Sequence, residues 1–221
     1  MEKIKFEKTR AHQSYKLADG TRVPGVTTVL GVVNKPALLS WAWEQGKAGL
    51  DFRKSRDAAA DVGTLAHWMI ECHLKGQEPD LSEFSPKDVE KAENAVIKFL
   101  SWWDGAEFRV IGTELKLVSE INRFGGTLDI VAEDKDGNVA IIDLKTSKAI
   151  YTEHWRQVAA YADVFGQHNW RKVTRFIICR IGKSEADADF EVQERGCLDF
   201  ELATFMACLA LYQAIQAEKR G

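Results

Sequence analysis

Apolar residues recur at two different spacings along this chain, and the spacing changes near residue 106. In the first part they return every three or four positions, as on a buried helix face, and afterwards they mostly alternate with polar residues, as in strands. The expected helices are 26–30, 36–43, 53–74, 85–103, 152–165 and 198–218. The expected strands are 109–119, 126–133, 139–145, 173–181 and 189–194, after a short hairpin that turns at Asp19–Gly20. This order predicts an α/β domain with an N-terminal helical part.

The strands around 127–133 and 139–145 are joined by Asp134-Lys-Asp-Gly-Asn138, a strong hairpin turn signal. A turn that is symmetric about Asp136 places Asp129 directly opposite Asp143, and Thr127 opposite Lys145. The apolar residues between them fall on the other face and can be buried against a core. The hairpin therefore brings two carboxylates and an ammonium group onto one face.

Two carboxylates that face each other across a hairpin indicate a cation between them. Opposed Cβ atoms lie about 5 Å apart, and like charges at that position are destabilising. Oxygen ligands suit Mg²⁺ or Mn²⁺, and Lys145 beside them can orient a water molecule or stabilise developing charge. The alternative is a solvated hairpin face with an ordinary salt bridge. The apolar neighbours Ile141, Ile142 and Leu144 argue against it, because a buried strand seldom carries two charges without a use for them.

Other polar residues could join this site. His67 lies one turn after Gly63, at or inside a helix start, and imidazole can bind a metal or orient a phosphate; a satisfied helical histidine is the alternative. Gln157 and Tyr161 share a face of the next helix, which begins where the Lys145 strand ends. Glu114 would add a third carboxylate if its strand neighbours Asp129, and a surface glutamate is the equal alternative.

Composition and charge narrow the function classes. The chain has 221 residues, 45% of them hydrophobic, which is enough for one sizeable core. A net charge of −3 argues against a generic nucleic-acid coat but not against an enzyme that acts on nucleic acid. The charged start and the lack of a long apolar run predict a cytoplasmic protein without a membrane segment. The four dispersed cysteines predict reduced core thiols.

A basic stretch and several tryptophans are weaker indications of DNA contact. Residues 145–183 hold eight basic and two acidic side chains, which marks either a solvated face or a binding surface. Most of the seven tryptophans are expected in the core, while Trp155 is the best candidate for stacking on an unpaired base. Lys148 and Arg156 are the neighbouring candidates for phosphate contact.

The order of the motifs resembles a known family. Gly63-Thr-x-x-His67, Gly126-Thr-x-Asp129, Asp143-x-Lys145 and Gln157-x-x-x-Tyr161 are similar to the ordered motifs of the RecB-like branch of the PD-(D/E)xK nuclease superfamily. The segments 24–30 and 35–41 resemble small phage-type exonucleases of that branch, and the mitochondrial genome maintenance exonuclease is a similar member. The resemblance covers about residues 20–165. It implies a single nuclease domain over 1–221, with a restriction-endonuclease-like α/β/α core, a small mixed sheet in 106–221, and a helical part in 1–105.

The same resemblance implies roles for these residues. Asp129 and Asp143 would ligate Mg²⁺ or Mn²⁺, with the Leu144 carbonyl and His67 completing the shell. Lys145 would position the attacking water, and Gln157 and Tyr161 would brace the scissile strand. Some relatives carry an iron–sulfur cluster, but the cysteines here are too dispersed for one. No phosphate-binding loop for ATP occurs in the sequence.

The resulting hypothesis is a metal-dependent DNA exonuclease. Its substrate would be single-stranded or end-containing DNA in recombination, repair or phage DNA processing, within a bacterial or phage-infected cell, and a recombination or replication protein could be its partner. One alternative is a structure- or sequence-specific endonuclease of the same fold. The other is a non-catalytic DNA-binding protein on a nuclease fold.

Overall fold

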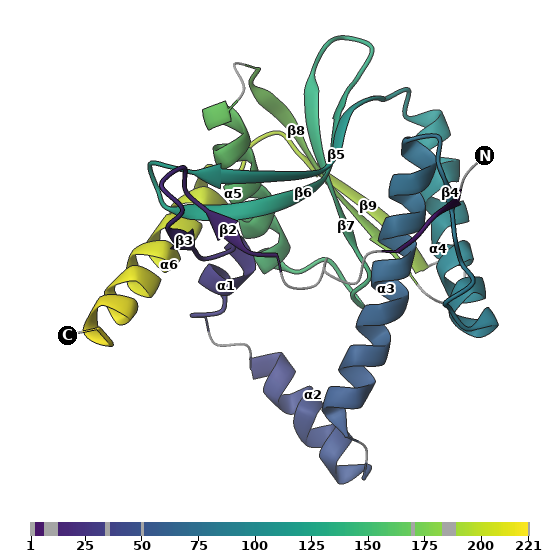
Figure 1. Cartoon of the computed structure of the whole chain (residues 1–221), viewed down its shortest axis with the longest axis horizontal. Coiled ribbons are helices and arrows are strands. Elements are labelled where there is room, and N and C mark those ends of the chain that lie inside the picture. The colour runs from purple at the N-terminus through teal and green to yellow at the C-terminus, as the bar shows by residue number, and fades with distance from the viewer. Residues whose placement is uncertain are drawn as a thin grey trace.

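A five-stranded mixed sheet forms the centre of the computed structural model, which describes residues 3–6, 13–33, 36–49, 51–168, 171–182 and 189–220 (Figure 1). The sheet order follows the chain order, β5-β6-β7-β8-β9. Its strands are β5 (Arg109–Ser119), β6 (Phe124–Glu133), β7 (Val139–Lys145), β8 (Val173–Ile181) and β9 (Phe190–Arg195). Only β7 and β8 run parallel among these neighbours, because the helix α5 (Thr152–His168) connects them across the sheet.

Helices cover both faces of this sheet, because both faces of its central strands are apolar. On one face Val131, Ile141 and Ile178 pack in a cluster with α1 (Val26–Leu30), α5 and α6 (Asp199–Glu218). On the other face Ile130, Ile142 and their neighbours pack in a second cluster with α3 (Phe52–Leu74) and α4 (Pro86–Gly105). The expected α/β/α core with a small mixed sheet is therefore confirmed.

The N-terminal segments surround the sheet rather than extend it. A hairpin of β2 (Tyr15–Lys16) and β3 (Arg22–Val23) lies near α1, and β1 (Lys3–Ile4) pairs with β4 (Glu78–Pro79). The strands expected from the sequence do not include this short parallel pair. The helix α2 (Pro36–Lys47) and the first half of α3 project away from the sheet (Figure 1). Lys35, which precedes α2, lies outside the described residues.

Local chemistry explains where α4 begins and how closely α3 approaches the sheet. Ser85 caps α4: its Oγ accepts a hydrogen bond from Asp88 N at 3.2 Å, and Pro86 occupies the first turn. Gly63 lies in the interior of α3, as the expected helix 53–74 implies, and not at a helix start. A Cβ atom at Gly63 would lie 2.5 Å from Thr146 Oγ1. The glycine therefore lets α3 approach the end of β7.

Three arginines of the basic stretch are neutralised by acids from other strands. Arg171 pairs with Glu133, Arg175 pairs with Asp134 and Glu194, and Arg180 pairs with Asp189 and Glu191. Lys183 lies outside the described residues. The interpretation of 145–183 as a basic surface is therefore wrong for these arginines, because charge counted along the sequence omits the partners that the sheet supplies.

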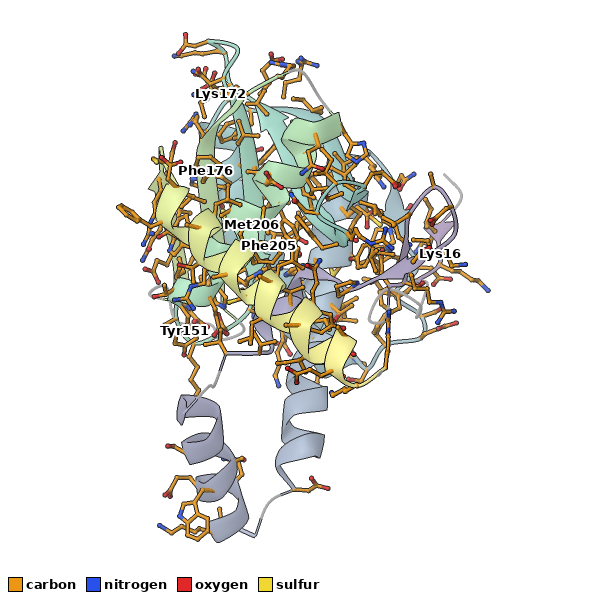
Figure 2. All side chains as sticks on the ribbon, turned by 90° about the vertical axis from the view of Figure 1, so that its left-hand side faces the viewer. Lys16, Tyr151, Lys172, Phe176, Phe205 and Met206 are labelled. Atoms are coloured by element: carbon orange, nitrogen blue, oxygen red, sulfur yellow. The ribbon has the colours of Figure 1, made fainter. Side chains whose placement is uncertain are left out.

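The C-terminal helix and the cysteines need two corrections. By length and composition alone, α6 qualifies as a candidate membrane span, so the expectation that no such segment exists does not hold for it. Its buried residues Phe205, Cys208 and Leu209 face the domain, and Figure 2 shows α6 lying across one side of the molecule with Phe205 labelled near its middle.

Cys72, Cys179 and Cys208 are buried thiols outside any disulfide, as expected, but Cys197 is exposed.

The β6–β7 turn predicts a pH effect on stability. Asp134 accepts hydrogen bonds from Asp136 N, from Asn138 and from Arg175 Nη1, the last at 3.0 Å. Partial burial raises the pKa of Asp134, but these hydrogen bonds outweigh it and lower that pKa from 3.8 to about 2. A lowered pKa stabilises the fold above about pH 4, and this contribution is lost as the pH falls toward 2.

We therefore expect Asp134→Asn to lower the melting temperature at pH 7 and to weaken the loss of stability between pH 4 and pH 2. Thermal unfolding across this pH range measures both effects. Asp136→Asn is the control in the same turn. If the Asp134→Asn curve ran parallel to that of the unmodified chain, the hydrogen bonds at Asp134 would not set this pH dependence.

Candidate active site

The predicted register of the β6–β7 hairpin is confirmed, but its ladder ends before the two aspartates. Ile130 pairs with Ile142 and Glu133 with Val139. Beyond Ile142, β7 continues its parallel pairing with β8, and Asp129 Oδ2 accepts a hydrogen bond from Leu144 N at 2.7 Å. The ladder thus ends one pair before Asp129 and Asp143, and the expected direct pairing of these two residues is not formed. Two opposed carboxylates at that position would be destabilising.

Asp143 is a fully buried carboxylate. It is 1% exposed, and its Oδ1 has no hydrogen-bond partner among the described residues. Lys145 Nζ forms an ion pair with Asp143 Oδ2. Burial raises the pKa of Asp143 to about 6, with Asp129 adding to the rise while Lys145 and His67 oppose it. A buried carboxylate with so few donors is costly to ionise, which is typical of functional sites.

Asp129 lies near Asp143 and is partly buried, with 17% of its side chain exposed. His67 Nδ1 lies 3.9 Å from Asp129 Oδ1, so α3 brings the predicted histidine to the predicted carboxylate. Burial raises the pKa of Asp129, and nearby Glu71 raises it further, whereas Lys145 and the Leu144 N–H lower it. Glu71, which the sequence left without a role, is buried on α3 and forms an ion pair with Lys75 at 2.6 Å. The site thus places several carboxylates near one another where they are largely buried.

A cavity of about 820 Å³ opens onto this cluster. The predicted site residues on its wall are His67, Glu114, Asp129, Leu144, Lys145 and Tyr161. Asp143 lies directly behind Lys145, and Gln157 lies behind Tyr161, to which its Nε2 donates a hydrogen bond at 2.6 Å. The condition set for Glu114 is met, because β5 pairs with β6 and Glu114 lines the same cavity as Asp129.

Two tyrosines enclose the strand segment that leads to Asp129. A Cβ atom at Gly125 would lie 2.4 Å from the ring of Tyr15, and one at Gly126 would lie 2.5 Å from the ring of Tyr161. Tyr15 Oη and Thr127 Oγ1 are hydrogen-bonded at 3.0 Å. The glycines therefore allow both rings to contact the backbone, and the N-terminal hairpin becomes part of the cavity wall. Sequence reasoning missed Tyr15, because only the fold brings it to β6.

We expect Gly126→Ala to destabilise the protein and to reduce any activity of the site, because its Cβ must displace Tyr161 or β6. The cost of such overpacking is about 1–3 kcal/mol. Gly166→Ala is the matched control: it lies on α5 with open space around its Cβ position, and it should stabilise the helix by about 0.5–1 kcal/mol. Urea unfolding of both variants measures this difference. Equal stability of the two variants would contradict the close packing at Gly126.

The predicted DNA contacts of Trp155, Lys148 and Arg156 have different outcomes. Trp155 is 2% exposed in the core, with the Arg195 guanidinium 4.2 Å above its ring, so it cannot stack on a base and that hypothesis is wrong. Its ring fills the space between α5 and the sheet, as an apolar helix position should. Lys148 is exposed in the loop after β7, and Arg156 is half-buried on α5. Neither lines the cavity.

The donors of the site fit a hard divalent cation in part. Asp129, Asp143 and the Leu144 carbonyl offer oxygen, and Asp143 Oδ1, which has no hydrogen-bond partner among the described residues, is an atom that a cation would satisfy. Within the part of the chain that the structure describes, no three His, Cys, Asp or Glu side chains gather closely enough to hold a metal by themselves. Mg²⁺ is commonly held by one or two carboxylates together with water and substrate phosphate, and this donor set suits that arrangement.

A family model of the PD-(D/E)XK nuclease superfamily matches residues 39–218, which include both aspartates, His67 and Lys145. The chain belongs to this superfamily. The match covers the helical part and the sheet together, so the PD-(D/E)XK assignment rests on the whole arrangement rather than on one motif. The chain is therefore a nuclease by family, and the resemblance of its ordered motifs is confirmed.

Solved structures give more distant likenesses to this PD-(D/E)XK chain. A putative exonuclease from Eubacterium rectale is 12% identical with a TM-score of 0.46, covering 69% of this chain and 65% of its own. The alkaline exonuclease LHK-Exo from Laribacter hongkongensis is 15% identical with a TM-score of 0.37, covering 74% of this chain and 93% of its own. The chain thus spans less than two thirds of the first protein. A comparison with curated proteins finds no match.

Proposed function

We propose that this protein is a divalent-metal-dependent DNA exonuclease that hydrolyses phosphodiester bonds at the Asp129–Asp143–Lys145 site. The observation that carries the proposal is the buried carboxylate of Asp143, which lies near Asp129 and forms an ion pair with the Lys145 ammonium group, while its Oδ1 has no hydrogen-bond partner among the described residues. A folded chain retains such a group at a cost in stability, and a cation would offset that cost.

The residues of the chain would divide the work as follows. Asp129, Asp143 and the Leu144 carbonyl would hold Mg²⁺ or Mn²⁺, with His67 beside Asp129 and Glu114 as an additional acid on the cavity wall. When bound, the cation lowers the pKa of water and neutralises charge at the phosphate. Lys145 would turn from Asp143 toward the cavity, donate a hydrogen bond to the attacking water and stabilise the negative charge that develops on phosphorus-bound oxygen.

Gln157 and Tyr161 would position the strand to be cut. Burial raises the pKa of Tyr161 well above its usual value, and Asp143 and Asp129 raise it further, so the phenol stays neutral and can donate a hydrogen bond. Gln157 Nε2 donates to the oxygen of that phenol and thereby leaves the Tyr161 proton for another acceptor. A phosphate oxygen in the cavity is the acceptor that we propose.

The substrate would be DNA that is single-stranded or has free ends. The same metal centre would serve an endonuclease, and a non-catalytic DNA-binding protein would not need the buried ion pair of Asp143 and Lys145. The family places this chain among nucleases, and recombination, repair or phage DNA processing would be its setting.

Linear and closed circular single-stranded DNA test the proposal together. The linear strand carries a 5′ or a 3′ label, and both DNAs are incubated with Mg²⁺, Mn²⁺ or EDTA. We expect loss of the linear DNA alone, with metal and not with EDTA, and the label gives the polarity. Cutting of the circle would replace the exonuclease with an endonuclease, and cleavage in EDTA would contradict the metal requirement.

A further inference from the structure

A second cavity, of about 460 Å³, lies between the β2–β3 hairpin and the C-terminal end of α6. We call it the arginine groove. Its lining residues are Thr21, Arg22, Val23, Pro24, Arg123, Tyr212, Gln213, Gln216, Ala217 and Arg220. Figure 1 shows the hairpin and the end of α6 on the side of the molecule opposite α4. The lining is basic and amide-rich, without a carboxylate.

The three arginines come from separate elements and converge on this groove. Arg22 belongs to β3, Arg123 to the β5–β6 turn, and Arg220 to the end of α6, and all three are exposed. None of them forms an ion pair with a residue that the structure describes, in contrast to Arg171, Arg175 and Arg180. Asp19 lies near Arg123: the pKa of Asp19 is lowered mainly by hydrogen bonds from Thr21 and to a smaller extent by Arg123. Because none of the three guanidinium groups is in an ion pair with a described residue, they can bind an anion.

The backbone at Arg123 is unusual for a long side chain. Its φ is +60°, in the left-handed region that glycine adopts without strain. The turn is closed by a hydrogen bond from Arg123 N to Ser119 O at 2.9 Å, and Asn122 N donates to Ser119 Oγ at 2.9 Å. Glycine suits this position, so Arg123→Gly removes the guanidinium group without straining the turn.

The arginine groove borders the catalytic cavity. Val23 and Pro24 line the groove, and Gly25 and Thr27, which follow along the chain, line the cavity. Gly125 N donates a hydrogen bond to Pro24 O at 2.9 Å, which ties this segment to the strand that carries Asp129. A strand of DNA that lies in both hollows would cross Pro24–Gly25.

We propose that the arginine groove binds the phosphodiester backbone of the DNA strand whose neighbouring segment lies in the catalytic cavity. This inference rests on the proposed nuclease function. Guanidinium groups bind phosphate oxygens in a bidentate manner, and Gln213 and Gln216 can donate to phosphate or sugar oxygens. The contacts carry no base specificity, so the groove increases affinity for a long strand without selecting its sequence.

The test compares a triple variant, Arg22→Gln with Arg123→Gln and Arg220→Gln, with a charge-matched control. The control is Lys87→Gln with Lys91→Gln and Lys172→Gln, which lie on α4 and before β8, outside both hollows. Fluorescence anisotropy in EDTA measures binding of a labelled single strand of about 20 nucleotides as salt is varied. A labelled trinucleotide, chosen because it is too short to contact all three arginines, measures cleavage in Mg²⁺.

We expect the arginine triple variant to bind the long strand roughly tenfold more weakly and to lower the salt slope by about 2, because three phosphate contacts are lost. The control should bind as the unmodified chain does, and trinucleotide cleavage should be unchanged in both. Arg123→Gly provides a variant whose backbone is relieved, so it should fold at least as stably and still lower the salt slope by about 0.7.

Unchanged affinity and salt slope in the arginine variants would overturn the proposal, and the groove would then suit an acidic protein surface instead. Equal weakening in the lysine control would overturn it as well, because net charge alone would explain the loss. If no variant or unmodified chain cleaves DNA but the arginine variants still lose binding, the groove stands and the proposed nuclease activity fails. The two failures are therefore distinguishable.

Discussion

Replacing Asp143 with asparagine is expected to abolish cleavage and, in the same molecule, to raise thermal stability. Asparagine has the shape of the buried carboxylate without its charge, so it would no longer hold a cation. We expect kcat to fall about 1,000-fold or more, which corresponds to roughly 4 kcal/mol of transition-state stabilisation.

The gain in stability follows from the burial of Asp143. Its pKa is raised to about 6, so this carboxylate is ionised at pH 8 in the folded metal-free protein, and the buried charge lowers the stability of the fold. Removing that charge should add on the order of 1–2 kcal/mol to the free energy of unfolding. Differential scanning calorimetry at pH 8 in EDTA measures this gain.

Asp163→Asn is the control, since Asp163 is a half-buried carboxylate on α5 that lies outside the catalytic cavity. Its cleavage activity should be unchanged. Loss of stability in Asp143→Asn together with unchanged cleavage would contradict the role of Asp143.

Replacing Lys145 with methionine is expected to abolish cleavage with the opposite effect on stability. Lys145 is the cation that opposes the raised pKa of Asp143, so its removal leaves a buried carboxylate uncompensated. The pKa of Asp143 then rises further above its ordinary 3.8, and stability falls as the pH rises through that pKa. Loss of one partner of a buried pair costs about 3–5 kcal/mol, and protonation of Asp143 reduces that cost.

The same variant should bind Mn²⁺ more tightly than the unmodified chain, because no ammonium group competes for Asp143. Cleavage should still fall by about 100-fold to 10,000-fold, as expected for loss of a group that orients or activates water. Lys172→Met is the control for removal of a lysine charge outside the cavity. Weaker Mn²⁺ binding by Lys145→Met would show that Lys145 supports the cation rather than competing with it.

The sequence predicted the central hairpin well, because turn chemistry and alternation are local. Asp134 and Asn138 close the turn through their own hydrogen bonds, and the register of Ile130 with Ile142 follows from it. What the sequence could not show is that the β6–β7 ladder ends at Ile142, whereas β7 stays paired with β8 as far as Lys145. The partner strand β8 lies more than 30 residues further along the chain, so no local pattern reveals it.

Predictions from charge and aromatic content failed for the same reason. Arg175 is neutralised by Asp134 and Glu194, which only the sheet brings near. Trp155 is of a residue type that can stack on bases, but it lies on the buried face of its helix, in the core. Conversely, the arginine groove joins residues separated by about 100 positions, so no local stretch of the sequence reveals it.

The most direct test of the account is Mn²⁺ binding, measured by electron paramagnetic resonance or calorimetry at pH 8 without DNA. We expect the unmodified chain to bind Mn²⁺, Asp143→Asn and Asp129→Asn to lose at least tenfold in affinity, and Asp163→Asn to bind as the unmodified chain does. Equal Mn²⁺ binding by all four proteins would show that the buried aspartates are not the metal site, and the proposed mechanism would then be wrong.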